Sequence, residues 1–176
     1  RLLVRPSAAA ALLVLLASGC AVVTSRVSMS YSNRLDPSER QVRNLVVLVR
    51  GDPFDPFFER TFRERLLADL GGRRVNARIT FAIGEGKSFQ RELERDAAIT
   101  TADVLLVVRP VQAYHEPGKR EVYRVFYEAR LVELASDKGL WEAKLEYWPE
   151  VRAHGGPLAH DVVKLLAKDR LLAADR

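Results

Sequence analysis

Two unbroken apolar runs in the chain predict strands that are buried on both faces of a sheet. These runs are residues 44–49 and 104–108. Between them, residues 75–83 alternate apolar and polar side chains, which is the period of a strand with one solvent-facing side. We therefore expect this third strand to lie nearer an edge of the sheet.

Two amphipathic helices are expected between these strands. Asp55 and Pro56 open the first helix in the favoured order, a capping acid followed by proline in the first turn, and Gly71-Gly72 ends it. Its inward apolar positions are Phe58, Phe62, Leu66, Leu67 and Leu70. The second helix covers residues 88–100 and has Phe89, Leu93 and Ala97 as its inward positions.

The C-terminal part of the chain predicts an antiparallel hairpin followed by a helix. Two long segments, 122–134 and 140–148, flank the turn sequence of residues 136–139. The inward residues of the second strand are Trp141, Ala143, Leu145 and Tyr147. A glycine and proline break at 155–157 precedes the last helix, whose inward stripe is Leu158, Val162, Leu165, Leu166 and Leu172.

The resulting order, β-α-β-α-β-β-β-α, predicts an α/β fold at the border with α+β. We expect a mixed sheet of about five strands with helices mainly on one face, formed by residues 44–176 as a single domain. In the preceding segment, Val27, Met29 and Tyr31 alternate with serines. This alternation is compatible with a flexible tether and equally with an edge strand laid on the domain.

Residues 1–19 have the composition of an export signal. Arg1 and Arg5 precede the apolar run 8–17, which is too short to cross a bilayer as a permanent helix, for which about 20 residues are needed. Small residues then lead to Cys20. The sequence Ala17-Ser18-Gly19-Cys20 resembles the lipobox of bacterial lipoprotein precursors. That resemblance implies cleavage between Gly19 and Cys20 and attachment of a diacylglycerol to Cys20.

The same resemblance implies a location for the mature protein. Residues 20–43 would form a lipidated cysteine and tether, with the membrane bound through the lipid on Cys20. Ala21 stands where an aspartate would favour retention at the inner membrane, so the expected location is the periplasmic face of the outer membrane. Cys20 is the only cysteine of the chain, and lipidation would remove an otherwise free exported thiol.

Charge and motifs exclude several kinds of function. The formal net charge of +5 falls by two when Arg1 and Arg5 are removed and is not clustered, so we expect no nucleic-acid partner. Residues 84–88 (GEGKS) end like a phosphate-binding loop, but Phe81 occupies the place of its first glycine, so no nucleotide is expected.

The histidines and the remaining motifs give no catalytic centre. His115, His154 and His160 are badly spaced for a metal site, with the break at 155–157 between the last two. The sequence contains neither GxSxG nor HExxH. We therefore expect no metal, no cofactor and no enzymatic activity.

Three aromatic residues are candidate contacts with a protein partner. Strand periodicity places Trp148 opposite the inward Tyr147, next to Pro149, where an indole ring can be exposed. Phe54 and Phe57 lie after the first apolar strand, at an edge where open α/β sheets tend to bind other molecules.

The domain also resembles a set of envelope proteins at the level of the fold. The features that carry this resemblance are the apolar first strand, the helix opened at Asp55-Pro56 and the hairpin turn before Leu140, within residues 44–172. The set comprises the N-terminal domain of the Tol-system periplasmic protein, the curli-export lipoprotein, an exopolysaccharide-export lipoprotein and lipoprotein activators of penicillin-binding proteins. These proteins use an anticodon-binding-like α/β domain as an adaptor.

The expected function is accordingly that of an outer-membrane lipoprotein whose periplasmic domain acts through protein contacts in envelope assembly or export. The alternative is a periplasmic enzyme or small-ligand-binding protein that uses the loops at 52–57 and 84–87.

Overall fold

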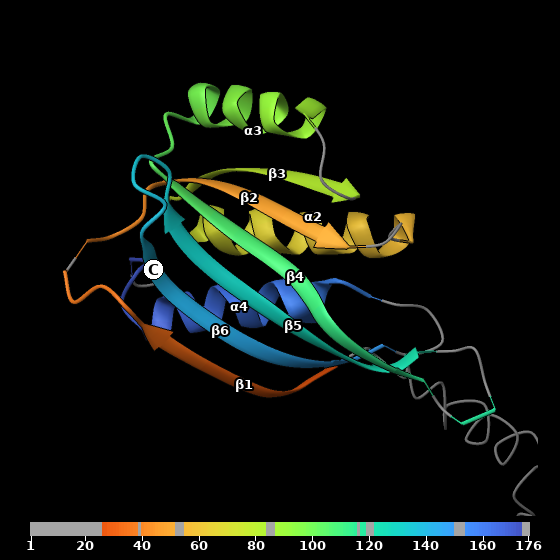
Figure 1. The fold of residues 1–176 in the computed structure, drawn as a ribbon. Coiled ribbons are helices and arrows are strands. Elements are labelled where there is room, and N and C mark those ends of the chain that lie inside the picture. The colour runs from red at the N-terminus through yellow and green to blue at the C-terminus, as the bar shows by residue number, and fades with distance from the viewer. Residues whose placement is uncertain are drawn as a thin grey trace, which may run out of the picture.

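Among the described residues, six strands form one mixed sheet in the order β1-β6-β5-β4-β2-β3 (Figure 1). The computed structural model describes residues 26–38, 40–51, 55–83, 87–115, 117–118, 122–149 and 154–173. The strands are β1 (Arg26–Arg34), β2 (Asn44–Gly51), β3 (Asn76–Ile83), β4 (Val104–His115), β5 (Val122–Glu133) and β6 (Gly139–Trp148). The helices are α2 (Pro56–Gly72), α3 (Lys87–Thr100) and α4 (Gly156–Lys168).

The predicted α/β class is confirmed, and so is the order of elements from Asn44 onward. Strand β2 pairs in parallel with both β3 and β4, whereas β4, β5, β6 and β1 pair antiparallel in succession. The expectation of about five strands is wrong, because β1 adds a sixth strand at the edge. The prediction that the strand at 75–83 lies near an edge is confirmed by the terminal position of β3.

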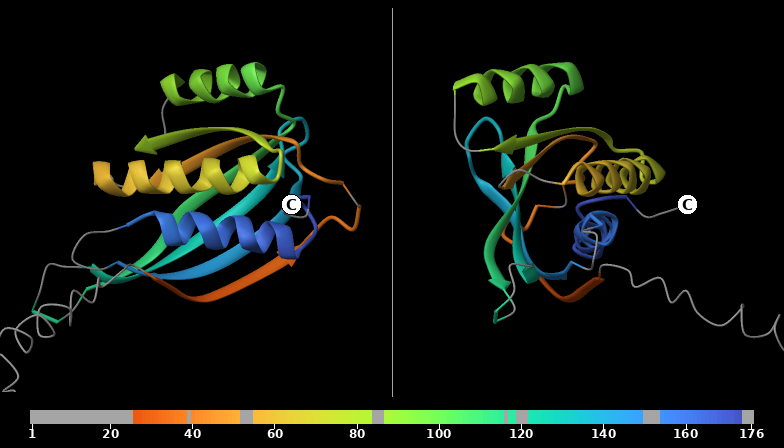
Figure 2. Two further views of the ribbon diagram at one scale, coloured as in Figure 1. Left: turned by 180° about the vertical axis from the view of Figure 1, so that it is seen from behind. Right: turned by 90° about the vertical axis from the view of Figure 1, so that its right-hand side faces the viewer.

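Helices α2 and α4 cover one face of the sheet, and α3 covers part of the other face (Figure 2). We call the face under α2 and α4 the back and the face that carries α3 the front. The main core lies at the back and includes the fully buried Trp141, Leu145 and Tyr147 predicted from the hairpin pattern. A smaller apolar cluster, which includes Val46, Leu48 and Leu105, lies at the front.

Helix α2 begins and ends where the sequence predicts. The Asp55 side chain accepts a hydrogen bond from the backbone N–H of Phe57 (2.8 Å), and Pro56 occupies the first turn, where its missing N–H costs nothing. The inward positions are buried except Leu67, which is 40% exposed. Leu67 lies one position after the buried Leu66, so the helical turn carries it away from the core.

Residues 27–31 lie in the edge strand β1. Of the two alternatives for this segment, a flexible tether or an edge strand, the second is confirmed. Strand β1 pairs antiparallel with β6 from Arg26 opposite Trp148 to Arg34 opposite Trp141. The folded domain therefore includes residues placed in the tether by the expected boundary at Asn44. Further on, the backbone N–H of Val42 donates to the carbonyl of Leu171 (2.8 Å), which fixes this segment to the C-terminal end of the domain.

The expectation that β3 has a solvent-facing side is confirmed at Asn76 and Arg78, which are exposed, but is wrong in the second half of the strand. Thr80 and Ala82 are buried there under α3. The Thr80 hydroxyl donates a hydrogen bond to the carboxylate of Asp96 on α3 (2.9 Å), and Asp96 itself is only 5% exposed. This buried polar pair fixes α3 against the sheet.

Strand β4 continues well past the apolar run that predicts it. Its pairing with β5 shifts register between Pro110 and Gln112, which leaves Val111 as an extra, half-exposed residue. A bulge of this kind accommodates a proline that cannot donate to the ladder. The strand therefore extends to His115.

Candidate functional site

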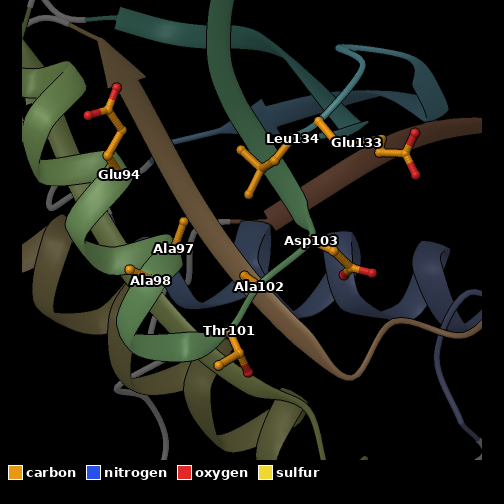
Figure 3. Close-up of a pocket in the computed structure, with 9 residues that line it drawn as sticks. Glu94, Ala97, Ala98, Thr101, Ala102, Asp103, Glu133 and Leu134 are labelled. Atoms are coloured by element: carbon orange, nitrogen blue, oxygen red, sulfur yellow. The ribbon is translucent and has the colours of Figure 1, made fainter.

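A groove of about 740 Å³ lies between the end of α3 and the end of β5 (Figure 3). We call it the α3 groove. Its apolar part consists of Ala97, Ala98, Ala102, Leu134 and Ala135. Its polar part consists of Glu94, Thr101, Asp103 and Glu133. In Figure 3, Leu134 lies between Glu94 on the helix side and Asp103 on the strand side.

The backbone around the groove is held by specific contacts. The N–H of Leu134 donates to the carbonyl of Asp103 (2.9 Å), which joins the two walls formed by β4 and β5. Helix α3 ends at Thr100, and the next residue, Thr101, has a left-handed φ of 50°. A β-branched residue adopts this conformation at a cost, whereas glycine would adopt it freely. One of the residues that line the groove is therefore held in a strained backbone conformation.

Two of the three acids in the groove share one arginine. Arg40 pairs with the carboxylate of Asp103 and, at 2.8 Å, with that of Glu133. The Ser136 hydroxyl also donates to Glu133 (2.5 Å). Hydrogen bonds from Ser136 and from Arg40 lower the pKa of Glu133 from its ordinary value. The groove consequently combines an apolar lining with carboxylates, two of which are paired with Arg40.

Trp148 lies on the front face, at the other end of β5 and β6 from the groove. Its indole N–H donates to the Ser28 hydroxyl (2.7 Å), and its ring lies between two guanidinium groups, 5.7 Å from Arg26 and 5.6 Å from Arg124. Arg124 also lies over Tyr114 (4.5 Å) and Phe126 (5.3 Å) and pairs with Glu146 (3.0 Å). Trp148 is therefore a fixed, partly buried member of an arginine–aromatic cluster.

Phe57 lies at the start of α2 on the back of the molecule. Its ring meets that of His154 edge-on at 5.4 Å, and the Arg60 guanidinium lies 5.4 Å from it. Phe57 and Trp148 thus occupy the same end of the domain but opposite faces of the sheet. The structure does not combine these two predicted partner contacts into one surface.

Several sequence-based predictions concern residues outside the described ranges. These residues are Gly19 and Cys20, the candidate contact Phe54, and residues 84–86 of the loop that resembles part of a phosphate-binding motif. The cleavage site, the lipidation of Cys20 and the absence of nucleotide binding accordingly remain predictions.

The histidines have ordinary structural neighbours. His154 Nδ1 accepts a hydrogen bond from the backbone N–H of Gly156 (3.1 Å). His160 Nδ1 lies 2.8 Å from Asp69 Oδ2 and 2.8 Å from Arg65 Nη2, within the contact between α2 and α4. Among the described residues, histidine, cysteine and acidic side chains do not gather in groups of three that could hold a metal ion.

The α3 groove was not identified from the sequence. It requires α3 to cross the front of the sheet beside the end of β5, an arrangement that no local pattern encodes. One usable signal was the apolar pair Leu134-Ala135, directly before the turn predicted at residues 136–139. The described part of the chain also contains no helix that is both long enough and apolar enough to span a bilayer.

Comparisons with known proteins give similarity at the level of the fold. No protein-family model and no curated protein matches the sequence. Two crystal structures of PelC dodecamers from Paraburkholderia phytofirmans, the first of them a variant, align with this chain. They have TM-scores of 0.52 and 0.50 at 14% and 15% identity, covering 84% and 86% of this chain and 100% of theirs.

A more distant alignment is with a neuraminyllactose-binding hemagglutinin homologue from Helicobacter pylori. It has 12% identity and covers 79% of this chain and 91% of that chain. Its TM-score is 0.29, which is too low to indicate a shared fold.

Proposed function

We propose that the protein is an outer-membrane lipoprotein, anchored through Cys20, whose α/β domain acts by protein–protein contacts in envelope assembly or export. The observation that carries this proposal is the alignment of the domain with the whole length of PelC chains that form dodecamers. It favours a domain that works through contacts between proteins, and we include contacts between copies of this chain.

The distance between the anchor and the domain supports a role at the membrane surface. Strand β1 begins at Arg26, six residues after Cys20. Six residues span at most about 20 Å when fully extended, since each residue adds about 3.3–3.6 Å. The end of the domain that contains Arg26 and Trp148 would therefore stay next to the membrane. Such a short connection keeps the domain close to the membrane surface, whereas the sequence predicted a longer tether.

The polar groups of the α3 groove also favour binding over catalysis. Asp103 and Glu133 are paired with Arg40, and the groove is open and largely lined by alanine and leucine. A general acid or base needs a carboxyl group poised to exchange a proton near neutral pH. The lowered pKa of Glu133 moves this group away from that condition.

The groove also supports a second candidate function, the binding of a small ligand. A volume of about 740 Å³ lies within the range of small-molecule sites, which is roughly 300–1,000 Å³. A small-ligand-binding protein would use this groove, because it combines an apolar lining with carboxylate side chains. Its chemistry would favour a cationic ligand with an apolar part.

Anchoring and assembly can be tested on the full-length protein in cells. Metabolic labelling with a tagged palmitate should mark the wild-type protein and not Cys20→Ser, and density-gradient separation should place the labelled protein with outer-membrane markers. The protein extracted in mild detergent should then give a discrete multimer by native mass spectrometry. An unlabelled wild-type protein, or a labelled protein that sediments with inner-membrane markers, would contradict the proposed anchoring.

A crosslinking experiment tests the adaptor role. In-cell crosslinking followed by affinity capture should recover one stoichiometric envelope partner with the wild type and lose it with Cys20→Ser. Recovery of the protein alone, as a monomer, would favour the ligand-binding alternative. The α3 groove would then be screened with small cationic compounds.

A further inference from the structure

An arginine stacked on a tryptophan lies where the chain enters the domain from the proposed anchor. Arg26 is the first residue of β1, opposite the last residue of β6, Trp148 (Figure 1). Arg26 is exposed, and its guanidinium lies 5.7 Å from the centre of the indole ring. A guanidinium that stacks on a ring keeps its N–H donors free at the edge of its plane. Arg26 can therefore bind an anion while it remains on Trp148.

The carboxylate of Glu146, in the same cluster, is already bound by other groups. The Ser28 hydroxyl donates to its Oε2 (2.8 Å), and Arg124 donates to its Oε1 (3.0 Å). The Ser28 oxygen in turn accepts the indole N–H of Trp148 (2.7 Å). These contacts balance the charge of Arg124 against that of Glu146. In the described part of the chain Arg26 forms no ion pair, so its positive charge is not compensated within this cluster.

The hydrogen bond to Ser28 also gives Arg26 a fixed platform. Because the indole N–H is bound, the ring of Trp148 has a defined orientation, and tryptophan is the best aromatic partner for a cation. A guanidinium held on such a ring loses less conformational freedom when it binds a ligand. Its planar array of donors matches the oxygens of a phosphate group.

The proposed anchor brings Arg26 close to phosphate groups in a membrane. Only six residues separate it from Cys20, a span of at most about 20 Å. The headgroup layer adds about 5–8 Å to each side of the hydrocarbon core of a bilayer. A short flexible connection gives an effective concentration in the millimolar range. A contact that is too weak to hold the domain from solution can therefore be well populated in the anchored protein.

We propose that Arg26, positioned by Trp148, binds the headgroup phosphate of anionic phospholipids in the membrane that holds Cys20. The inference rests on the anchoring proposed above and adds the lipid chemistry that the domain recognises. One basic side chain near an anionic surface shifts the binding equilibrium by about fivefold. The corner formed by the start of β1 and the end of β6 then lies on the membrane, instead of at the end of an extended tether.

Tryptophan quenching in vesicles tests the contact with the full-length lipidated protein. The protein is reconstituted into phosphatidylcholine vesicles with and without phosphatidylglycerol, both containing a phospholipid with a nitroxide on its headgroup. The signal of Trp148 is the difference between each protein and its Trp148→Phe counterpart. Phosphatidylglycerol should raise the quenching of Trp148, with a change of about fivefold in the ratio of bound to unbound domain. High salt should reduce this increase, because it screens the charges.

Substitutions at Arg26 identify the group that binds. Arg26→Gln should abolish the effect of phosphatidylglycerol, whereas Arg26→Lys should retain most of it, because lysine keeps the charge. The matched control is Arg130→Gln. Arg130 is also exposed on the front of β5, but it lies six residues beyond Arg124 and away from Trp148. This control should behave as wild type, and circular dichroism verifies that each variant is folded.

The outcomes separate this inference from the proposed function. Equal quenching of the lipidated wild type in both kinds of vesicle would overturn the inference and leave the anchoring intact. An effect of phosphatidylglycerol that persists in Arg26→Gln, or that is lost equally in Arg130→Gln, would also overturn it. A wild-type protein that is not labelled with palmitate and does not remain with the vesicles would overturn the anchoring and the inference together.

Discussion

Arg26 and Trp148 face each other at the first rung of the antiparallel ladder between β1 and β6, and the Arg26 guanidinium lies 5.7 Å from the indole ring. The pairing fixes the point at which the described chain enters the domain. Because the proposed lipid-bearing residue is only six residues earlier, the distance of Trp148 from a bilayer becomes measurable.

Lengthening the connection between Cys20 and Arg26 should move Trp148 away from the membrane. An insertion of ten Gly/Ser residues before Arg26 adds a flexible segment of about 17 Å root-mean-square length. Energy transfer from tryptophan to dansyl-labelled lipid headgroups should then decrease. The chain has two tryptophans, so the contribution of Trp148 is the part of the signal lost in Trp148→Phe, which retains Trp141. Equal transfer with and without the insertion would contradict the proposed geometry.

Gly155, at the N-cap of α4, packs against α2, so a methyl group there should destabilise the domain. A Cβ at Gly155 would lie 2.6 Å from the carbonyl oxygen of Phe58 and 2.6 Å from the Cβ of Phe62. We expect Gly155→Ala to lower the free energy of unfolding by about 1–3 kcal/mol, measured by urea denaturation.

The control for this substitution is Gly71→Ala in α2, where a new Cβ would meet nothing within 4 Å. Its free energy of unfolding should be unchanged or higher by up to about 1 kcal/mol, because alanine favours the helix. Similar losses in both variants would show that close packing at Gly155 is not the cause.

Thr80→Val should loosen α3 selectively. The substitution removes the 2.9 Å hydrogen bond to Asp96 Oδ2 and leaves the carboxylate with the longer contact from Arg78 to Oδ1 (3.4 Å). A hydrogen bond to a charged group contributes about 1.5–3 kcal/mol. Hydrogen exchange should accelerate in α3 more than in α2, as measured by mass spectrometry. Thr101→Val is the control, because its exposed hydroxyl donates only to the adjacent carbonyl of Thr100 in the described contacts. Uniform acceleration across all helices would contradict a local role for the pair.

The stabilising effect of Glu133 should depend on pH in a defined direction. Hydrogen bonds from Ser136 and Arg40 lower its pKa in the folded state, so the ionised carboxylate stabilises folding at pH above its ordinary range. This contribution is lost as the pH falls through the lowered value. The midpoint of urea unfolding should therefore be lower for Glu133→Gln than for wild type at neutral pH, and the two should converge in acid. Glu64→Gln, an exposed change on α2, should follow the wild type throughout.

Much of the back of the fold could be predicted from the sequence because the relevant signals are local. Asp55 and Pro56 define the start of α2, and the alternation from Trp141 to Tyr147 separates core from surface on β6. Each of these signals depends on neighbours within a few residues or on strand periodicity alone.

The front of the fold could not be predicted in the same way. Thr80 and Asp96 are polar residues whose burial depends on α3 crossing the sheet, and neither shows this in its local sequence. The β1 segment, in which serines alternate with other residues, forms a strand because β6 is available to pair with it. The α3 groove combines segments more than thirty residues apart along the chain, such as Glu94 and Glu133, so its shape depends on tertiary packing.

The register shift in β1 affects how crowded copies behave at a surface. An edge strand exposes backbone donors and acceptors that can recruit a strand from another molecule. In β1 the pairing shifts between Val27 and Met29, and arginines occupy both ends of the strand. A distorted, positively charged rim resists continuous strand addition. Proteins concentrated by lipid in two dimensions would thus avoid amyloid-like association through this edge and remain available for specific contacts.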